Sequence, residues 1–457
     1  MTTYHVRIHK GADREDVLSA LRSLGEVREF SQIPQLVEWE GPSSVEPDLA
    51  AIEGVRSFER DSPSKVQPEQ THDVDLGMAE GAGQLPIVWH GQKPGSRYYR
   101  TVWDLLRPGE KAIFDYDPTA TIGDGTGVNV YIADSGVESN HAEFSGRFGG
   151  ILYNDFTSDV GAHGMACATA ALGLTMGVAP GATVFDCRVF PTTGSTSASQ
   201  IISGMNAALA EHNGGTAPGV LSCSFGGDAS SDPYNAAIEA CVDAGLPVVA
   251  AAGNSGRDLG ATGGSLNHWP AENEDCVTVG GIDRHFRIHP RSNRYGQVDL
   301  YASYHAWTVA RVGGGFRGAL SWRGTSFSCP MVSGLLARMM TGTTKMTSRA
   351  EVETLRQDLM LNYTVGDVID VSGLPLEGAS RLYIPGVTLT GFAPATPPVR
   401  GLPDATPVRV DTARTHAILG SVQSGVAVRK ASADMVLGSP AAGVATRSAI
   451  THVIVEP

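Results

Sequence analysis

The sequence lacks any uninterrupted run of about 18 apolar residues, the shortest run expected to cross a membrane as a helix. It begins MTTYH, without the apolar stretch of a signal peptide. Positive charge is also scarce, since 34 lysines and arginines stand against 48 aspartates and glutamates, for a net charge of −14. Nucleic-acid binding requires a basic surface. We therefore expect a protein that is cytoplasmic as synthesised, with no membrane span and no nucleic-acid partner.

Cysteine is sparse, and none of the six forms a Cys-x-x-Cys pair typical of a metal site. All six lie in apolar or small-residue stretches of one region: Cys167, Cys187, Cys223, Cys241, Cys276 and Cys329. In the absence of an export signal, we expect them to be reduced and buried as small apolar side chains rather than joined in disulfides.

The first 62 residues predict a small separate domain. Residues 4–8 alternate apolar and polar side chains, as in a half-buried strand, and residues 13–25 have the pattern of a helix with Asp13 before it and Gly25 after it. A second round follows in residues 36–39, 47–53 and 55–61. The resulting βαββαβ order is that of a small ferredoxin-like α+β domain.

The region from residue 100 to 390 alternates short apolar runs with helical patterns. With 42% hydrophobic residues and only 18% charged ones, the chain can bury a large core. Such alternation predicts an α/β domain, a three-layer sandwich with a mostly parallel sheet. The expected inner strands include residues 184–190, 220–223 and 246–250.

A serine at the start of a helix is the first candidate for chemistry. Ser326 follows Gly324 and Thr325 and precedes a run of small and apolar residues. A serine hydroxyl is a poor nucleophile near neutral pH, so it needs a base that takes its proton and an acid that orients the base. Asp134, after the strand-like run 128–133, is the candidate acid, and His163, at the head of a helical run, is the candidate base.

An asparagine supplies a fourth element. The strand-like run 248–252 stops at Gly253 and Asn254. Attack on an amide carbonyl places negative charge on its oxygen, and an asparagine amide can donate to that oxygen together with the backbone N–H of Ser326. Each element alone has a simpler interpretation, as a turn, a structural histidine or a loop. All four together, in the order Asp, His, Asn, Ser, favour a hydrolase.

At these segments the chain resembles the subtilisin-like serine proteases, or subtilases, and within them the proteinase K-like branch. Residues 134–147 follow the family's aspartate block, and residues 251–254 and 324–326 match its asparagine and serine blocks. The resemblance covers roughly residues 100–390. It implies an endopeptidase that acts on protein or peptide substrates and needs no cofactor for its chemistry. The implied catalytic residues are Asp134, His163, Ser326 and Asn254.

Two blocks depart from the family pattern. His163 is followed by Gly-Met-Ala, so the usual threonine and second histidine are missing, and residues 327–330 read Phe-Ser-Cys-Pro in place of Met-Ala-Thr-Pro. None of the replaced residues carries a proton in the reaction, so we expect an active enzyme.

The resemblance also implies where substrate binds. One segment forms a wall of the primary specificity pocket, a second forms the opposite wall with room for a large side chain, and a third pairs with an extended substrate. The alternatives are a plain core strand and a flexible loop. The three segments are Ser224, Phe225 and Gly226; Ala251, Ala252 and Gly253; and Gly194, Ser195 and Thr196.

The N-terminal domain, by its position, resembles the family's inhibitory propeptide. It would then be an intramolecular inhibitor, in a precursor that processes itself somewhere in the linker 63–99, which contains Gly81-Ala82-Gly83 and Gly95-Ser96. The alternative that the domain stays attached is open.

A structural calcium is a further expectation. Asp299 resembles a calcium ligand of the proteinase K-like branch, with carbonyls near Asn273 and Asp275 completing the site. Calcium prefers oxygen ligands, and a single carboxylate is a minimal signal for it.

Residues 391–457 form a proline-rich linker and a tail. The tail has β-prone runs at 427–429 and 452–455 but few large side chains for a core. It either packs on the enzyme or tethers it to a partner assembly, such as a phage particle. Two other functions remain open for the whole chain: a subtilase-like self-processor, and a scaffold or binding protein.

Overall fold

The computed structural model of the chain describes two units, residues 1–388 and 389–457. The described residues are 1–61, 63–64, 123–158, 160–174, 177–192, 195–227, 232–259, 268–283, 286–308, 320–365, 368–372, 376, 379–382, 431–437 and 445–451. Residues 65–99 of the expected processing linker and the β-prone runs 427–429 and 452–455 lie outside them. In the second unit, β18 (Ala431–Leu437) and β19 (Ala445–Thr451) form an antiparallel pair.

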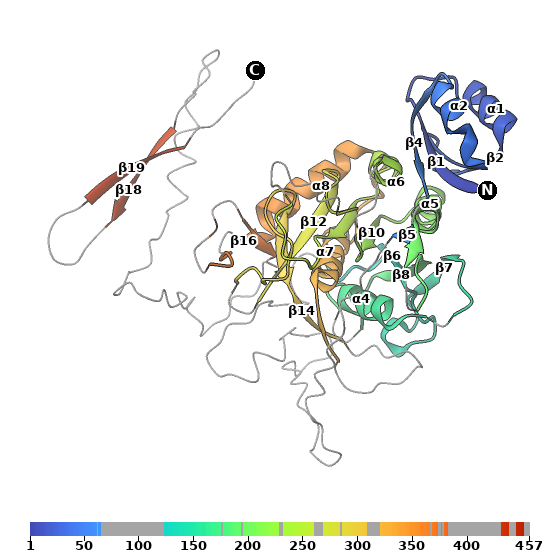
Figure 1. Cartoon of the computed structure of the whole chain (residues 1–457). Coiled ribbons are helices and arrows are strands. Elements are labelled where there is room, and N and C mark those ends of the chain that lie inside the picture. Colours follow the sequence, from blue (N-terminus) through green and yellow to red (C-terminus); the bar gives the residue numbers. More distant parts are fainter. Residues whose placement is uncertain are drawn as a thin grey trace. The chain divides into compact units, whose positions relative to one another are not determined.

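The N-terminal residues have the predicted βαββαβ order (Figure 1). The sheet is antiparallel with the strand order β2-β3-β1-β4. The Asp13 carboxylate accepts hydrogen bonds from two backbone N–H groups and so begins the first helix, which buries Val17, Leu18 and Leu21. The elements are β1 (Thr2–Ile8), α1 (Arg14–Leu24), β2 (Glu26–Glu29), β3 (Leu36–Gly41), a 3₁₀ turn (Ser43–Val45), α2 (Glu46–Ala51) and β4 (Val55–Arg60).

The first strand corrects one expectation. A half-buried strand was predicted, but all of residues 4–8 are buried. Tyr4, Val6 and Ile8 pack in the domain's own core, whereas His5 and Arg7 point at the helices of the larger domain. The alternating apolar and polar residues of this strand therefore face two different neighbours: the domain's own core on one side and the larger domain on the other. The domain boundaries themselves stay a prediction.

The larger domain is built on a nine-stranded sheet. Every neighbouring pair is parallel except β16 with β17. Because connections between parallel strands cross over the sheet, helices cover both of its faces. In spatial order the strands are β7 (Phe148–Asn154), β8 (Thr183–Arg188), β6 (Asn129–Asp134), β10 (Gly219–Cys223), β11 (Val248–Ala251), β12 (Cys276–Ile282), β13 (Leu300–Ser303), β17 (Arg381–Leu382) and β16 (Thr364–Val365).

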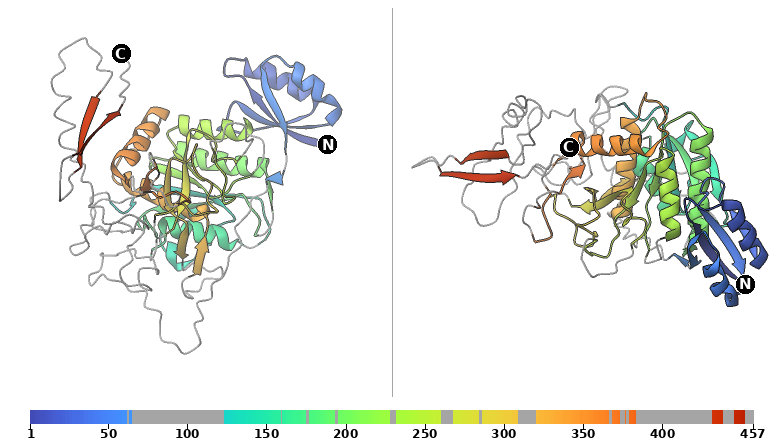
Figure 2. Two further views of the ribbon diagram at one scale, coloured as in Figure 1. Left: turned by 60° about the vertical axis from the view of Figure 1, so that its left-hand side comes forward. Right: turned by 90° about the horizontal axis from the view of Figure 1, so that it is seen from above.

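Figure 2 shows the helices on the two faces of this sheet. The helices α4 (Ala162–Leu172) and α7 (Thr325–Met339) pack on one face, and α5 (Ala198–Gly214) and α6 (Asp232–Asp243) pack on the other. On β6, Val130 and Ile132 enter the first core and Tyr131 and Ala133 the second. The three-layer α/β prediction is confirmed. The remaining elements are α8 (Arg349–Asn362), a 3₁₀ turn (Ala142–Phe144), β5 (Pro63–Ser64), β9 (Thr196–Ser197), β14 (His305–Thr308) and β15 (Leu320–Arg323).

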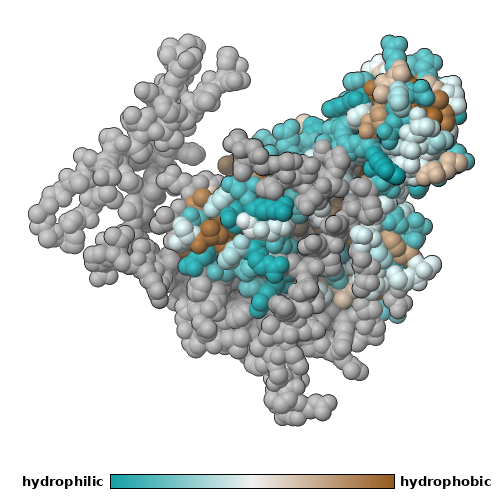
Figure 3. All heavy atoms as spheres, viewed as in Figure 1, coloured by the Kyte–Doolittle hydropathy of each residue, from teal (hydrophilic) through white to brown (hydrophobic). Residues whose placement is uncertain are grey.

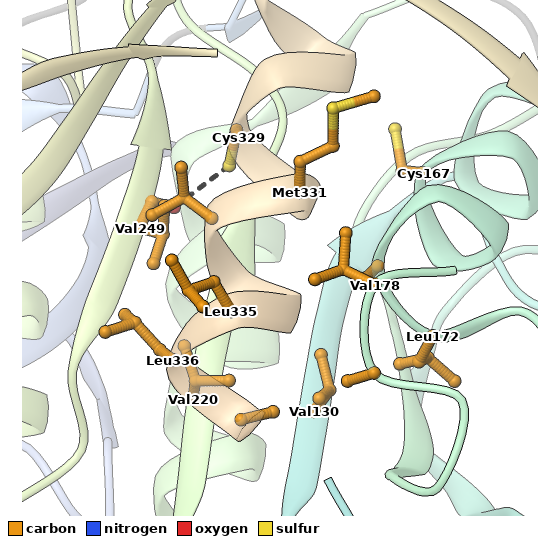
Figure 4. Close-up of a cluster of buried hydrophobic side chains, with 14 of the residues drawn as sticks. Val130, Cys167, Leu172, Val178, Val220, Val249, Cys329, Met331, Leu335 and Leu336 are labelled. Carbon is orange, nitrogen blue, oxygen red and sulfur yellow. Dashed lines mark hydrogen bonds between the residues drawn. The ribbon is translucent and has the colours of Figure 1, made fainter. Parts of the chain in front are cut away.

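The helix α7 packs on the sheet beside α4 (Figure 4). Gly334 allows the two helices to touch, because a Cβ at this position would lie 2.4 Å from the carbonyl oxygen of Ala171. Cys329 is buried on the sheet side, where its Sγ donates to the Val249 carbonyl at 3.4 Å. All six cysteines are buried and free, as expected.

The described surface in Figure 3 is mainly hydrophilic, with hydrophobic residues in small separate areas. Within the described residues, the exposed large hydrophobic side chains are Met1, Ile151, Leu174 and Leu361. Of the helices that the structure describes, none has the length and apolar character that a membrane crossing requires.

Candidate active site

The end of β6 and the start of α4 bring an acid and a base together. Asp134 is the last residue of β6, and His163 lies in the first turn of α4. Gly164 allows the close approach, since a Cβ there would lie 2.5 Å from the Gly136 carbonyl oxygen. His163 Nδ1 is 2.8 Å from Asp134 Oδ1 and 3.0 Å from Oδ2.

This contact sets the tautomer of the imidazole. An ionised carboxylate can only accept, so Nδ1 carries the proton and Nε2 is the basic nitrogen. Burial disfavours the imidazolium, but the charge of Asp134 and its hydrogen bond outweigh burial and raise the pKa of His163. The backbone N–H of Ser135 donates to Asp134 Oδ1 at 2.7 Å and helps to hold the carboxylate.

The serine lies at the start of α7, against the same histidine. Gly324 precedes the helix with φ at 141°, a value that favours glycine. Ser326 is buried, and its carbonyl oxygen accepts from Cys167 Sγ at 3.4 Å, while the same sulfur lies 3.7 Å from His163 Nδ1. Considering the described residues alone, His163 Nε2 has no hydrogen-bond partner. The acid and base are therefore paired, whereas no hydrogen bond joins Nε2 to the hydroxyl of Ser326 in this structure.

Asn254 is oriented by the residue before the serine. Its Oδ1 accepts from Thr325 N at 2.8 Å and from Thr325 Oγ1 at 3.1 Å. Because a backbone N–H can only donate, the oxygen is identified and the amide Nδ2 remains as a donor beside Ser326. Gly253, with φ at 100°, donates its N–H to Thr325 Oγ1 at 2.9 Å and holds the same loop.

The two departures from the family pattern are buried packing changes. Met165 is buried, and its sulfur accepts from the backbone N–H of Glu138 at 3.0 Å. Ser328 donates to the Ser303 carbonyl at 2.9 Å, and Cys329 to that of Val249. These contacts fasten the first turn of α7 to β13 and β11, so the new residues support the position of Ser326.

Three side chains of kinds that can bind a metal ion also lie close together at this site. One possible ligand atom each of Asp134, His163 and Cys167 lies within 4.8 Å of the others. Burial raises the pKa of the Cys167 thiol well above its usual value, so the sulfur is a neutral thiol and not the thiolate that metals prefer. We interpret the group as the acid and base of a hydrolase with a buried thiol beneath them.

The expected substrate segments have mixed outcomes. Gly194 lies outside the described residues, whereas Ser195 is exposed and Thr196 belongs to β9. The strand β9 pairs antiparallel with β5, in the register Ser64 with Thr196. The expected walls follow β10 and β11 at the same edge of the sheet.

A histidine that the sequence reasoning missed lies between these two walls. A Cβ on Gly226 would lie 2.3 Å from His268 Nε2, and one on Gly253 would lie 2.1 Å from the same atom. The ring is held in place because Gly227 and Trp269 exchange two backbone hydrogen bonds, at 3.0 and 3.1 Å. The space expected for a large substrate side chain is thus reached by an imidazole. No signal in the sequence separates His268 from a loop histidine.

The calcium expectation fails a test of fit. Asp299 Oδ1 is paired with the Arg356 guanidinium, and Oδ2 accepts from Thr278 N at 2.7 Å. The carboxylate of Asp275 is likewise paired with Arg349. Calcium needs six to eight oxygen ligands. The carboxylate predicted to bind calcium and a carbonyl between Asn273 and Asp275, that of Glu274, are both bonded to the Arg356 guanidinium, so these residues do not fit the ion.

Comparisons with known proteins identify the family to which this sequence is related. A model of the subtilase family matches residues 125–373. Proteinase R of Parengyodontium album is 33% identical over 277 residues, which cover 58% of this chain and 68% of that protein. Subtilisin-like protease 3 of Pseudogymnoascus destructans is 36% identical over 233 residues, covering 49% of this chain and 54% of the relative. A cuticle-degrading serine protease of Orbilia oligospora is 32% identical, with coverages of 49% and 51%.

The chain therefore spans about two thirds of the first of these relatives and about half of the other two. Among solved structures, a cold adapted subtilisin-like serine proteinase matches with a TM-score of 0.48 and 28% identity, over 58% of this chain and 91% of the other.

Proposed function

The chain belongs to the subtilase family and is a subtilisin-like serine endopeptidase, and from this premise we propose that Asp134, His163 and Ser326 act as one catalytic unit. The observation that carries the proposal is the bond from His163 Nδ1 to Asp134, at 2.8 Å, beside an Nε2 that remains available. General-base catalysis requires a basic nitrogen that can take the proton of the serine, and Nε2 has no other hydrogen-bond partner among the described residues.

In the first half of the reaction, His163 Nε2 takes the proton of Ser326 as its Oγ attacks the carbonyl carbon of the scissile bond. The imidazolium is stabilised by Asp134, whose carboxylate also raises the pKa of the ring. The negative carbonyl oxygen accepts from Asn254 Nδ2 and from the backbone N–H of Ser326. The proton then passes from His163 to the leaving amine, which departs and leaves an acyl-enzyme.

In the second half, water takes the place of the amine. His163 removes a proton from the water, the resulting hydroxide attacks the acyl carbon, and the proton returns to Ser326 Oγ as the acid product leaves. No step requires a metal ion or an organic cofactor.

The N-terminal domain serves in this proposal as an intramolecular inhibitor. Arg7, which is 2% exposed, donates to both carboxylate oxygens of Glu239 on α6, at 2.7 and 2.8 Å. Asp61 accepts from the backbone N–H groups of Ala198 and Ser199 at the start of α5, at 3.0 and 3.3 Å. The chain leaving the domain then pairs as β5 with β9, which lies in a segment expected to bind substrate. These contacts support a self-inhibited precursor.

Labelling and turnover test the proposal together. A fluorophosphonate probe should label the wild-type protein once its N-terminal domain has been released, and should fail to label Ser326→Ala. A casein substrate should likewise be cleaved only by the wild type. A wild-type protein that resists the probe after release of the N-terminal domain, or that cleaves casein equally well as Ser326→Ala, contradicts the proposal.

One alternative has an observation of its own. The pairing of β5 with β9 favours an enzyme that cleaves its own linker. Such a self-processor should show a change in gel mobility that Ser326→Ala abolishes, and it should fail to cleave casein added in trans.

A further inference from the structure

The cluster around Asp299 joins three separate parts of the chain. Arg356, in the middle of α8, pairs through Nη2 with Asp299 Oδ1 and donates through Nη1 to the carbonyl oxygen of Glu274 at 2.6 Å. Asp299 Oδ2 accepts from Thr278 N on β12, at 2.7 Å. One guanidinium thus contacts the carboxylate and a backbone carbonyl at once.

The buried carboxylate of Asp299 needs a cation beside it in order to stay ionised. Burial raises the pKa of Asp299, because an ionised carboxylate loses its hydration there. Burial by itself would lower the pKa of Arg356. The carboxylates of Asp299 and Glu353 outweigh this effect, so the pKa of Arg356 is raised. A positive charge at this position therefore stabilises the ionised Asp299, which the Thr278 N–H also favours.

From this geometry we propose that the Arg356 guanidinium takes the place of a bound calcium ion, because it neutralises Asp299 and also binds the nearby carbonyl oxygen. A carboxylate and a nearby carbonyl are the oxygen ligands that calcium takes in proteins. Here the guanidinium of Arg356 bonds to both the carboxylate and the carbonyl, and this cation is a side chain of α8 itself. The position of α8 on the sheet is then independent of divalent cations. Removal of the guanidinium frees Asp299 Oδ1 and the Glu274 carbonyl oxygen as two ligands for calcium, which can take its remaining oxygens from water.

Packing alone leaves this part of α8 incompletely held. A cavity of about 120 Å³ lies against the helix. Apolar side chains line it together with Arg349 and Arg356: Val242, Val248, Val277, Leu336 and Val352. Arg349, in the first turn of α8, pairs with Asp243 and Asp275 and so ties the helix to α6 and to the chain before β12. Ion pairs of two arginines that line the cavity thus fasten the helix.

Thermal unfolding of the full chain, with Ser326→Ala as background to prevent self-cleavage, tests the inference. Arg356→Ala should lower Tm in EDTA by about 5 °C or more, because it leaves the buried carboxylate of Asp299 without its cationic partner. Added CaCl2 should raise the Tm of this variant by several degrees more than that of the parent. The gain should vanish in the double variant Arg356→Ala/Asp299→Ala. Arg356→Gln, which keeps most of the side chain, gives the same comparison if the alanine variant fails to fold.

Lys345→Ala is the matched control. Lys345 is also a cation on carbonyl oxygens, those of His212, Asn213 and Gly215 at 2.8, 3.3 and 2.9 Å. Its atoms contact no carboxylate in these bonds, so its removal should lower Tm without creating a calcium response. Equal calcium responses in the parent and both Arg356 variants, or a response that persists without Asp299, would overturn the inference. Because every readout is a Tm in a Ser326→Ala background, the result is independent of proteolytic activity.

Discussion

Asp134 and Asp299 are both buried carboxylates with bonded oxygens, but the polar atoms around them differ. Asp299 has both oxygens committed, one to a guanidinium and one to a backbone N–H. Near Asp134, two buried polar atoms of the described residues have no hydrogen-bond partner, Nε2 of His163 and Oδ1 of Asp186. A buried polar group without a partner costs stability. The carboxylate that holds a helix thus has only bonded neighbours, whereas the one beside the chemistry has neighbours whose buried polar atoms are unbonded.

The largest effect expected from this contrast is the loss of activity in Ser326→Ala. Removing the nucleophile should lower kcat/KM by at least about 1,000-fold. The Tm should stay within about 2 °C of the wild type, because Ser326 Oγ contributes no described bond to the fold. Peptide hydrolysis and calorimetry on the same samples measure both. A large fall in Tm would break the contrast, since Ser326 would then be a structural residue.

Asn254→Ala should have the next largest effect. It should lower kcat by about 100- to 1,000-fold with little change in KM, the range known for subtilisin, a member of the same family. The donor acts on the charged oxygen of the transition state and not on the bound substrate, so KM is spared. Steady-state kinetics on one peptide decide the point. A rise in KM at unchanged kcat would assign Asn254 to substrate binding instead.

Asp186→Asn should stabilise the protein at neutral and alkaline pH. Burial raises the pKa of Asp186 to about 7 from its ordinary 3.8. Between these values the unfolded chain releases the proton while the folded chain retains it, so stability falls as pH rises through this window and levels off above pH 7. Asparagine avoids this loss, worth about 2–4 kcal/mol.

Calorimetry across this pH range checks the sign. The Tm of Asp186→Asn should exceed that of the wild type above pH 7 and approach it near pH 4. A variant that is equally or less stable throughout would show that the open oxygen of Asp186 carries no cost.

His268→Ala sharpens the contrast at the substrate end. The imidazole reaches the space between Gly226 and Gly253, so its removal should admit a larger substrate side chain. The ratio of kcat/KM for Phe over Ala at the residue before the scissile bond should rise about 10-fold or more. The exposed His9, changed to alanine, is the control. An unchanged ratio would place the ring outside the specificity pocket.

The smallest expected effect is a shift in the pH profile. Catalysis needs neutral His163, and its pKa is raised above the ordinary 6.5 by Asp134. The acidic limb of kcat/KM should therefore have its midpoint above pH 6.5 and, in Asp134→Asn, move to lower pH as the rate falls. A limb that stays in place in the variant would show that Asp134 does not set the pKa of His163.

Much of the fold and of the candidate site could be predicted from local sequence. The strand before Asp134, the helix after His163 and the helix at Ser326 all occur where their patterns predicted them. Such elements are predictable because hydrophobic period and capping are encoded within a few residues. The family blocks added which side chains should meet.

The errors arose where a distant partner decides the outcome. Burial of His5 and Arg7 depends on α5 and α6, some 200 residues away in the chain. The guanidinium on Asp299 comes from α8, 57 residues later, so the sequence around Asp299 carried no sign that the cation site is taken. His268 was missed for the same reason, because its neighbours Gly226 and Gly253 lie in distant parts of the chain, after β10 and β11.

The most direct test of the central claim is a crystal structure of the protein inactivated by a fluorophosphonate. The account predicts phosphorus bonded to Ser326 Oγ, a phosphonyl oxygen within hydrogen-bond distance of Asn254 Nδ2 and Ser326 N, and His163 Nε2 facing the modified oxygen. An adduct on another residue, or an imidazole turned away from Ser326 with Asp134 still bound to it, would contradict the account.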